Sequence, residues 1–260
     1  MGFVTVETVD HIATVTLDRP PVNAVDTDTM AELRDVFSAI SEDRHVRVAI
    51  FTGAGTRAFI GGADLKRLDD TSTADEWPPS RVVDRGRVAR DAMWAILDCG
   101  VPVIGAINGP AIGAGLAFAA VCDVILASET ATFGTTEINV GLLGASTHLS
   151  MLVGRHKARE LFFTGELVPA AELYRLGAVR AVVAPDELMG AARELAVTLA
   201  AKSPIALRLA KESMNRVEGL PVKESYRTEQ DYTSRLLGFE DSREARRAFF
   251  EKREPEWRWR

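Results

Sequence analysis

The stretch PVIGAINGPAIGAGLAFAAVCDVILAS, residues 102–128, contains the pattern that decides the fold. Two apolar runs of strand length, 102–109 and 121–128, flank a glycine-rich turn and an apolar helix that begins near Ala114-Gly115. Strands that alternate with helices predict a largely parallel sheet with helical crossovers. The stretch carries no carboxylate, imidazole or amine before Asp123, so an acid or base that acts here must come from another segment.

The residues before this stretch show the same alternation. Period-2 patterns rich in β-branched residues predict strands over 3–9, 12–17 and 46–53. Only Asp10-His11 separates the first two strands, which predicts a hairpin. Apolar side chains at helical spacing predict a helix over 26–40, with Thr27 or Asp28 as its N-cap. The same spacing predicts a helix just before the opening stretch, with the apolar residues Val88, Ala92, Ala95 and Ile96.

The chain after about residue 145 is mainly helical, apart from a short strand that follows Gly177. We therefore expect an α/β core over residues 1–195 and a helical C-terminal region over residues 196–260. The polar stretch 68–80 contains Pro78-Pro79 and is expected to form a surface loop, mobile or lid-like.

The composition is that of a globular protein with a sizeable core. Of the 260 residues, 47% are hydrophobic and 26% are charged. The net charge of −6 argues against general binding to nucleic acid or to a membrane surface. We see no signal peptide and no membrane-spanning run. Cys99 and Cys122 stand in apolar contexts without metal-ligand spacing, which is typical of buried free thiols in a reducing cytoplasm.

A second glycine-rich segment, FTGAGTRAFIGGADLK, covers residues 51–66. It lacks the Gly-Lys-Ser/Thr of a P-loop, and Ala58 stands where a dinucleotide-binding fingerprint needs its third glycine. We expect a helix to begin at about Ala63-Asp64, as another does near Ala114. The first N–H groups of a helix lack internal partners, so two such ends facing each other would form an oxyanion hole. Glycines that only permit tight packing are the other interpretation, and the spacing alone leaves both open.

Glu137 provides a carboxylate in a third glycine-rich stretch, ATFGTTEINVGLLGASTHLSMLVG, residues 131–154. It stands between a β-type segment and the apolar run INVGLLG. A carboxylate that is buried in such a place must be protonated, hydrogen-bonded or catalytic. A solvated glutamate in an exposed loop is the alternative.

Four stretches of the chain resemble the crotonase, or enoyl-CoA hydratase/isomerase, superfamily. They are RPPVNAVDTDTMAEL, AIFTGAGTRAFIGGADLKRL, PVIGAINGPAIGAGLAFAAVCDVILASETATFGTTEINVGLL and GRHKARELFFTGELVPAAELYRLGAVRAVVAPDEL. The similarity continues into SPIALRLAKESMNR and EDSREARRAFFEKREPEW, so it covers nearly the whole chain in the family's order. It implies an α/β fold, a crotonase-like spiral of ββα units with a helical C-terminal trimerisation region, and a homo-oligomer, either a trimer or a hexamer.

The resemblance also implies an acyl-CoA site. The backbone N–H groups of Ala63 and Ala114 match the two donors of the family's oxyanion hole, although the family usually has glycine at the second position. The CoA would lie along GGADLK, which contains Ala63, Asp64, Leu65 and Lys66, with its 3′-phosphoadenosine near Arg57-Ala58. Lys252 matches a basic residue that reaches CoA, often from a neighbouring subunit; a solvated surface lysine is the alternative.

One departure from the family bears on the chemistry. Typical hydratases have two glutamates, but this chain has Ala117 at the first position and Glu137 at the second. The turn LLGASTHLSML is also shorter than the PGAGGTQRL-like turn of hydratases, and it contains His148. This histidine either takes the vacant role or is a helix-start residue that follows a Thr147 cap.

These features lead to an expected function with alternatives. We expect an enoyl-CoA hydratase/isomerase in which Glu137 is the single acid/base. Hydrolysis or C–C cleavage of an acyl-CoA that involves His148 is one alternative, and a non-catalytic acyl-CoA binder is another. The resemblance implies no metal and no cofactor, because coenzyme A is part of the substrate.

Overall fold

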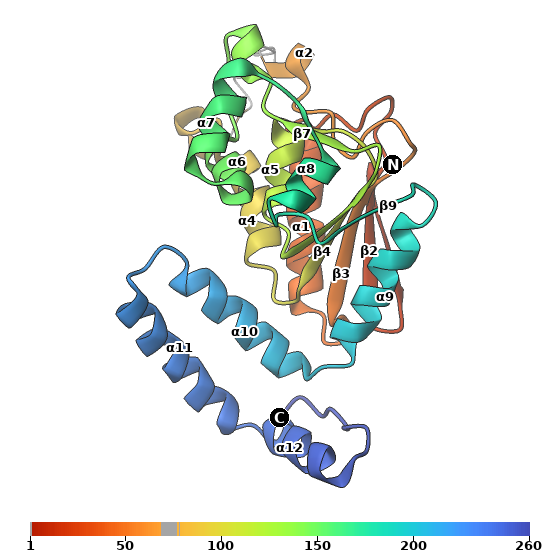
Figure 1. Cartoon of the computed structure of the whole chain (residues 1–260), viewed down its shortest axis with the longest axis vertical. Helices are drawn as coiled ribbons and strands as arrows, with labels where there is room; N and C mark the ends of the chain where they lie inside the picture. The colour runs from red at the N-terminus through yellow and green to blue at the C-terminus, as the bar shows by residue number, and fades with distance from the viewer. Residues whose placement is uncertain (1, 69–76, 78) are drawn as a thin grey trace.

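The computed structural model describes residues 2–68, 77 and 79–260, and this part of the chain contains two sheets. The larger sheet has the strand order β1-β2-β3-β4-β6-β9 (Figure 1). β1 and β2 form the predicted antiparallel hairpin, and every other neighbouring pair in this sheet is parallel. The strands are β1 (Val4–Val9), β2 (Ile12–Leu17), β3 (Val48–Gly53), β4 (Val103–Ile107), β6 (Val124–Ser128) and β9 (Ala181–Val183).

Helices cover both faces of the larger sheet. α1 (Thr27–Glu42) and α4 (Arg87–Leu97) pack on one face, and α9 (Leu188–Ala200) packs on the other. β3 and β4 are buried at every residue, as is typical of parallel strands that are covered on both sides. The sequence shows no polar alternation in these strands for the same reason.

The N-cap of α1 differs from the prediction. Asp26, rather than Thr27 or Asp28, is the cap, because its backbone is extended and its Oδ1 accepts the Thr29 N–H at 2.9 Å. Thr27 and Asp28 already belong to the first turn of the helix. The side-chain oxygen of a cap accepts the N–H of the second or third helical residue, and only Asp26 stands at the right distance before Thr29.

A smaller sheet, with the strand order β5-β7-β8, lies beside the glycine-rich segments. Its strands are β5 (Ala111–Ile112), β7 (Thr132–Gly134) and β8 (Val168–Pro169), and β5 leads directly into α5 (Ala114–Ala120). The other elements of this half of the molecule are α2 (Leu65–Leu68), α3 (Pro79–Val83), the 3₁₀ helix η2 (Glu137–Val140), α6 (Ser146–Val153), α7 (Arg155–Thr164) and α8 (Ala170–Arg175).

The predicted surface loop over residues 68–80 falls mainly on residues 69–76 and 78, which lie outside the described residues. Its two ends are helical rather than loop, because Leu68 ends α2 and Pro79 begins α3. Proline at the start of a helix is favoured, because the N–H that it lacks would have no partner there.

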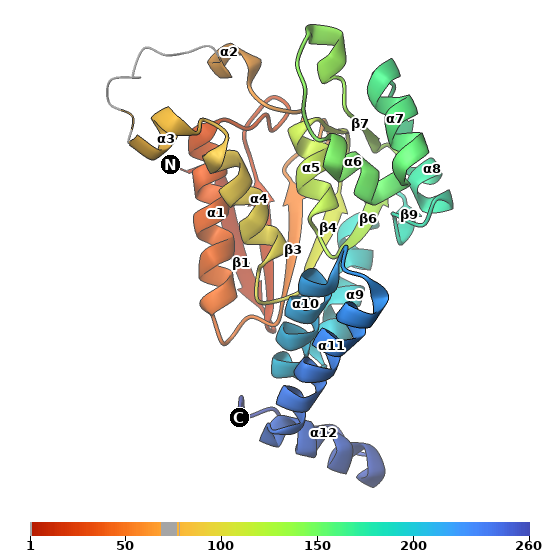
Figure 2. The same cartoon turned by 90° about the vertical axis from the view of Figure 1, so that its left-hand side faces the viewer.

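The C-terminal region consists of α10 (Pro204–Val217), α11 (Val222–Leu237) and α12 (Glu240–Glu251). Figures 1 and 2 show these helices extending from the core at the end opposite α2, with α12 farthest away. Ser203 caps α10 as expected, since its Oγ accepts the Ala206 N–H at 3.2 Å. The expected boundary after residue 195 falls inside α9, which packs on the sheet, and the division into two units stays a prediction.

α10 is attached to the core by a buried lysine. Lys211 Nζ donates to the carbonyl oxygens of Ile96 (3.0 Å) and Val101 (3.2 Å) and to Asp123 Oδ2 at 2.7 Å. The same Asp123 oxygen accepts the Val103 N–H at 2.7 Å. The single carboxylate of the opening stretch therefore holds α10 against β4.

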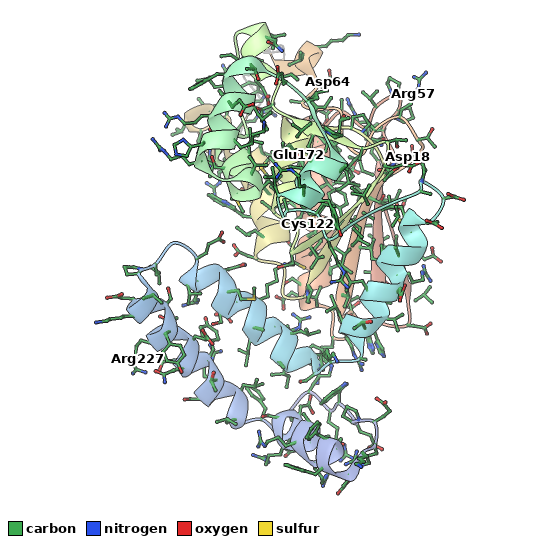
Figure 3. The ribbon with its side chains drawn as sticks, viewed as in Figure 1. Asp18, Arg57, Asp64, Cys122, Glu172 and Arg227 are labelled. Atoms are coloured by element: carbon green, nitrogen blue, oxygen red, sulfur yellow. The ribbon has the colours of Figure 1, made fainter. Side chains whose placement is uncertain are left out.

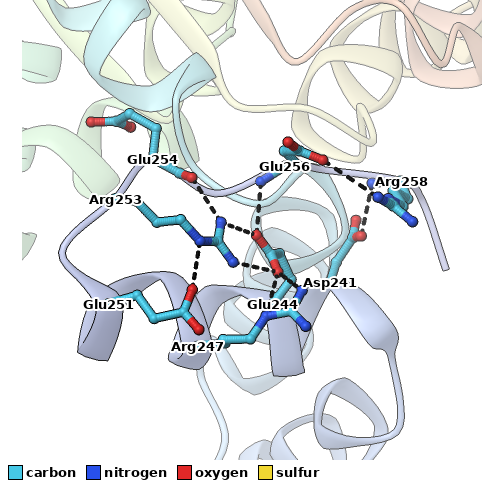
Figure 4. Close-up of polar contacts among 8 residues, drawn as sticks. All are labelled: Asp241, Glu244, Arg247, Glu251, Arg253, Glu254, Glu256 and Arg258. Carbon is cyan, nitrogen blue, oxygen red and sulfur yellow. Dashed lines mark hydrogen bonds and ion pairs between the residues drawn. The ribbon is translucent and has the colours of Figure 1, made fainter.

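The last residues of the chain fold back along α12 (Figure 4). Glu244 accepts hydrogen bonds from the guanidinium of Arg253, and Asp241 accepts the N–H groups of Arg258 (2.8 Å) and Trp259 (3.0 Å). The arginine hydrogen bonds hold the pKa of the Glu244 carboxyl well below its usual range. These contacts fix the C-terminal tail to α12.

Candidate active site

Two backbone segments run side by side at the start of α5. Ile60 and Ala111 form a parallel bridge, and the Ile112 N–H donates to the Ile60 carbonyl oxygen at 3.1 Å. In a parallel pairing, equal steps along both chains keep residues opposite each other. The bridge places the segment that leads to Ala63 beside the segment that leads to Ala114.

Glycines allow this close approach. A Cβ at Gly115 would overlap the Ile60 carbonyl oxygen, and a Cβ at Gly62 would lie 3.4 Å from the Ile112 carbonyl oxygen. Gly62 also has a φ of +115°, which side-chain-bearing residues rarely adopt. Gly115 is therefore required by the close approach of two backbones and Gly62 by its φ, whereas the oxyanion hole stays a prediction.

Aromatic packing anchors the two segments to the sheet. The ring of Phe51, on β3, contacts Phe59 at a centroid distance of 5.1 Å and Phe118 at 6.3 Å. Phe59 precedes the Ile60 bridge, and Phe118 lies on α5, so one buried ring supports both sides of the pairing.

The N–H groups of Ala63 and Ala114 are free to bind a ligand. Within the described part of the chain, neither donates a hydrogen bond. Ala114 is the first residue of α5, where an N–H has no partner inside the helix. Ala63 is extended and pairs with Val25, and α2 begins two residues later than expected, at Leu65. Both alanines are partly exposed.

The carboxylate of Glu137 lies against the residue that precedes Ala114. A Cβ at Gly113 would overlap Glu137 Oε1, and a Cβ at Gly144 would lie 2.9 Å from the same oxygen. The Gly113 N–H donates to the Gly134 carbonyl oxygen at 2.9 Å, which places the chain leading to Glu137 beside α5. One carboxylate thus lies next to one of the two free N–H groups.

Glu137 is half-buried, and burial raises the pKa of its carboxyl. Its Oε2 is shielded from solvent and has no hydrogen-bond partner among the described residues. Removing a carboxylate from water disfavours the charged form, so this group holds a proton at a higher pH than an exposed glutamate does. A carboxyl with a raised pKa can accept and return a proton near neutral pH.

Asp64, Leu65 and Lys66 follow Ala63 directly. Leu65 and Lys66 are exposed on α2, whereas Asp64 forms an ion pair with Arg19 (2.9 Å). Arg19 also pairs with Asp26, the N-cap of α1, at 2.9 Å. The carboxylate of Asp64 therefore fixes the segment to α1. Arg19 was not found from the sequence, because its two partners lie 7 and 45 residues away.

Two asparagine side chains hold the loop around Arg57. Asn23 is 3% exposed, and its Nδ2 donates to the carbonyl oxygens of Ala54 (3.1 Å) and Ala58 (3.0 Å). Asn108 Nδ2 donates to the Gly55 carbonyl oxygen at 2.8 Å. Figure 3 shows Arg57 and Asp64 at the end of the molecule opposite α11. Arg57 itself is exposed, so its guanidinium is accessible to a ligand.

Ala117 and His148 lie on two helices that pack against each other. Ala117, on α5, is 1% exposed and presents only a methyl group. His148 is the third residue of α6, a helix that packs against α5. The N-cap of α6 is Ala145, whose φ is +55°, rather than Thr147. Burial lowers the pKa of the His148 imidazole. Within the described residues no hydrogen bond to the ring is found.

Lys252 does not belong to this group within one chain. It is exposed at the end of α12, at the opposite end of the molecule from α2 (Figure 2). A Lys252 that reaches an acyl-CoA site must therefore reach that of another copy of the chain.

No group of three or more histidine, cysteine, aspartate or glutamate side chains in the part of the chain that the structure describes is arranged to hold a metal ion. Among the described helices, none combines the length and the apolar character needed to cross a membrane.

The chain is similar to known proteins along its whole length. Residues 7–260 match the profile of the family described as Enoyl-CoA hydratase/isomerase. The sequence is 38% identical over 255 residues to the (7aS)-7a-methyl-1,5-dioxo-2,3,5,6,7,7a-hexahydro-1H-indene-carboxyl-CoA hydrolase of Rhodococcus jostii, covering 98% of this chain and 96% of that protein. It is 34% identical over 264 residues to the short-chain-enoyl-CoA hydratase of Clostridium acetobutylicum, covering 98% and 97%. The crystal structure of an enoyl-CoA hydratase from Bacillus anthracis matches with a TM-score of 0.89 at 31% identity, covering 98% of both chains.

Proposed function

Because the chain belongs to the enoyl-CoA hydratase/isomerase family, whose members act on acyl-CoA thioesters, we propose that it transfers protons on an enoyl-CoA. In this proposal the N–H groups of Ala63 and Ala114 bind the thioester oxygen, and Glu137 is the single acid/base. The observation that carries it is the position of the Glu137 carboxylate against Gly113, the residue before one of the two free N–H donors.

The two N–H groups stabilise the negative charge that develops on the thioester oxygen when an enolate forms. Removal of one such donor from an oxyanion hole typically costs about 3–4 kcal/mol of transition-state stabilisation. The hole makes the α-proton acidic and the β-carbon of a 2-enoyl thioester electrophilic. Both routes place enolate charge on the same thioester oxygen, so one site serves both reactions.

For isomerisation, Glu137 removes an α-proton from a 3-enoyl thioester and returns a proton to the γ-carbon, which moves the double bond to the 2-position. For hydration, the oxygen of a water molecule bonds to the β-carbon while Glu137 takes one of its protons. The π electrons of the double bond pass to the enolate, and Glu137 then delivers the proton to the α-carbon. One carboxylate supplies every proton transfer in both sequences.

A pair of assays on one substitution tests the proposal. Water addition to crotonyl-CoA and double-bond migration in a 3-enoyl-CoA are measured for the wild type and for Glu137→Gln. We expect the substitution to lower both rates by roughly 10²- to 10⁴-fold, the usual contribution of a general acid–base group. Rates in the variant equal to those of the wild type would refute the role of Glu137. Binding of acyl-CoA without turnover would instead favour a non-catalytic binder.

A second candidate function is hydrolysis of a carbon–carbon bond in a cyclic acyl-CoA. Two observations favour it: the relative from Rhodococcus jostii is named as a hydrolase of a bicyclic acyl-CoA, and Ala117 leaves the site without a second carboxylate. In this reaction water adds to a ring ketone at the β-carbon, the bond between the α- and β-carbons breaks, and its electrons form the thioester enolate. Under this candidate His148→Ala abolishes ring opening, and an unchanged rate counts against it.

The remaining features of the proposal concern binding and assembly. The CoA moiety lies along residues 61–66 and Arg57, and Lys252 of a neighbouring copy contacts it. We propose a trimer or hexamer, which the exposure of Phe249 (78%) and Phe250 (80%) on α12 supports. No metal or further cofactor takes part, and coenzyme A enters with the substrate. The buried free thiols of Cys99 and Cys122 support a reducing compartment, and we propose the cytoplasm.

A further inference from the structure

Thr135 is a buried polar residue that the chemistry described above does not use. Its side chain is 0% exposed, and its Oγ1 has no hydrogen-bond partner within the described residues. Buried hydroxyl groups in folded proteins nearly always have a partner. A partner from outside the chain is therefore needed for this one.

Thr135 lies between the two residues that touch Gly113. On one side, the Gly134 carbonyl oxygen accepts the Gly113 N–H at 2.9 Å. On the other, the Glu137 carboxylate occupies the space where Gly113 would carry a Cβ. Thr135 thus lies in a segment whose neighbouring residues contact Gly113 at the start of α5.

Thr135 directly follows β7, and continuation of the strand alternation by one residue would place its side chain on the same side as that of Phe133. A Cβ at Gly134 would contact Leu167 and the carbonyl oxygen of Glu166, so the residues on either side of Gly134 face the opposite way. On that side Phe133 packs into the main core, to which Leu116 and Phe118 of α5 belong.

Glu137, like Thr135, has a buried side-chain oxygen without a hydrogen-bond partner. Its Oε2 is shielded from solvent and has no partner among the described residues, although Oε1 lies against Gly113 and Gly144. A hydroxyl both donates and accepts, whereas a carboxylate accepts. One water molecule within reach of both oxygens can donate one hydrogen to each of them.

We propose that Thr135 is a positioning residue which, together with Glu137, holds the water molecule that adds to the substrate. This inference rests on the proposed function. The water donates one hydrogen to Glu137 Oε2 and the other to Thr135 Oγ1. When its oxygen bonds to the β-carbon of the enoyl thioester, the first hydrogen passes to Glu137 as a proton, and the second remains in the product hydroxyl. Thr135 thereby replaces the second carboxylate that Ala117 does not provide.

The test separates reactions that consume water from those that do not. Hydration of crotonyl-CoA and isomerisation of a 3-enoyl-CoA are measured for Thr135→Val, which keeps the shape of the side chain and removes the hydroxyl, and for Thr135→Ser, which keeps the hydroxyl. Thr136→Val is the matched control, because it makes the same change at the next residue. Thermal unfolding checks that each variant folds.

We expect Thr135→Val to lower kcat for hydration at least about tenfold, since the water loses its fixed position. Its KM for crotonyl-CoA and its isomerisation rate stay within about twofold of the wild type, because neither depends on the water. Thr135→Ser restores most of the hydration rate, and Thr136→Val changes neither reaction.

Three results overturn the inference. The first is full hydration by Thr135→Val, and the second is an equal fall of both reactions, which marks a structural role. The third is a wild type that isomerises but does not hydrate, which leaves the proposed function intact. Failure of the proposed function itself looks different, because Glu137→Gln then isomerises as fast as the wild type.

Discussion

Burial of the Glu137 carboxyl raises its pKa above the ordinary value of 4.5, so the folded protein binds this proton more tightly than the unfolded chain. Stability falls with rising pH wherever the native state binds more protons than the unfolded state. The charged carboxylate therefore costs stability at neutral pH, and this cost grows from pH 4.5 up to the raised pKa. The Glu137 carboxyl therefore does not serve to stabilise the folded protein at neutral pH.

Glu137→Gln is expected to make the protein more stable at pH 8 while it removes the activity. The amide is neutral at every pH, so it avoids the desolvation of a charge. The melting temperatures of variant and wild type are compared at pH 8 and at pH 4, where the glutamate is protonated in both states. The difference in melting temperature between the variant and the wild type should be smaller at pH 4 than at pH 8. A wild type that is equally stable or more stable than the variant at pH 8 would contradict this account.

Gly144→Ala tests the space around the same carboxylate. The new Cβ would lie 2.9 Å from Glu137 Oε1, and the φ of Gly144 is not positive, so the side chain of Glu137 must move while the backbone stays unstrained. We expect kcat to fall roughly 10- to 100-fold, as happens when a catalytic group is displaced by about 1 Å. Gly190→Ala, which meets nothing within 4 Å, is the control and should keep full activity. Unchanged kcat in Gly144→Ala would show that the carboxylate does not depend on this contact.

Some residues of the site could be predicted from the sequence and others could not. Glu137 was found because a carboxylate stands out in an apolar segment, and the site prediction as a whole is still open to test. Arg19, Asn23 and Thr135 carry no local pattern, because their role depends on partners that only the fold brings near. Asn23, for example, bonds carbonyl groups 31 and 35 residues away.

At the scale of elements, the strands of the larger sheet and the long helices follow from periodicity and from glycine, proline and serine signals. The two-residue strands β5 and β8 were missed, since two residues show no periodicity. β5 nonetheless matters for the candidate site, because its residue Ala111 pairs with Ile60. The start of α2 was misplaced for a related reason: Ala63 pairs with Val25, and this tertiary contact keeps it extended.

The link between α10 and the core gives a prediction at this scale. The Lys211 side chain is 5% exposed and that of Asp123 is 28% exposed, so an unpaired charge is worse at the lysine. We expect Asp123→Asn to destabilise the protein by about 3 kcal/mol and Lys211→Met to destabilise it less, because the methionine stem keeps its packing and leaves a more solvated carboxylate. Urea unfolding of the two single variants and of the double variant measures which substitution lowers the free energy of unfolding more. The reverse order would show that the carboxylate of Asp123 left without its lysine costs more than the buried lysine left without its carboxylate, which contradicts the argument from exposure.

At the scale of the whole molecule, the site and Lys252 lie at opposite ends of one chain (Figure 2). The tail contacts of Glu244 and Asp241 fix the end of α12, which keeps Lys252 at a defined place with φ +56°. Phe249 and Phe250, just before it, are exposed in a single chain. In the proposed assembly this apolar pair contacts another copy of the chain and brings Lys252 near an anionic group of that copy's CoA.

This arrangement predicts complementation between two defective chains. Lys252→Ala alone should raise the KM for acyl-CoA about tenfold, whereas the same change at the exposed Lys223 on α11 should not. Chains with Glu137→Gln are inactive but still offer Lys252 to a neighbour. When the two variants are unfolded and refolded together, sites with an intact Glu137 and a neighbour's Lys252 form, and a fraction of the activity should regain the wild-type KM. If the mixture keeps only the high KM of Lys252→Ala, then Lys252 does not act between copies. In that case its exposure at the end of α12 is that of a solvated surface lysine, the alternative that the sequence left open.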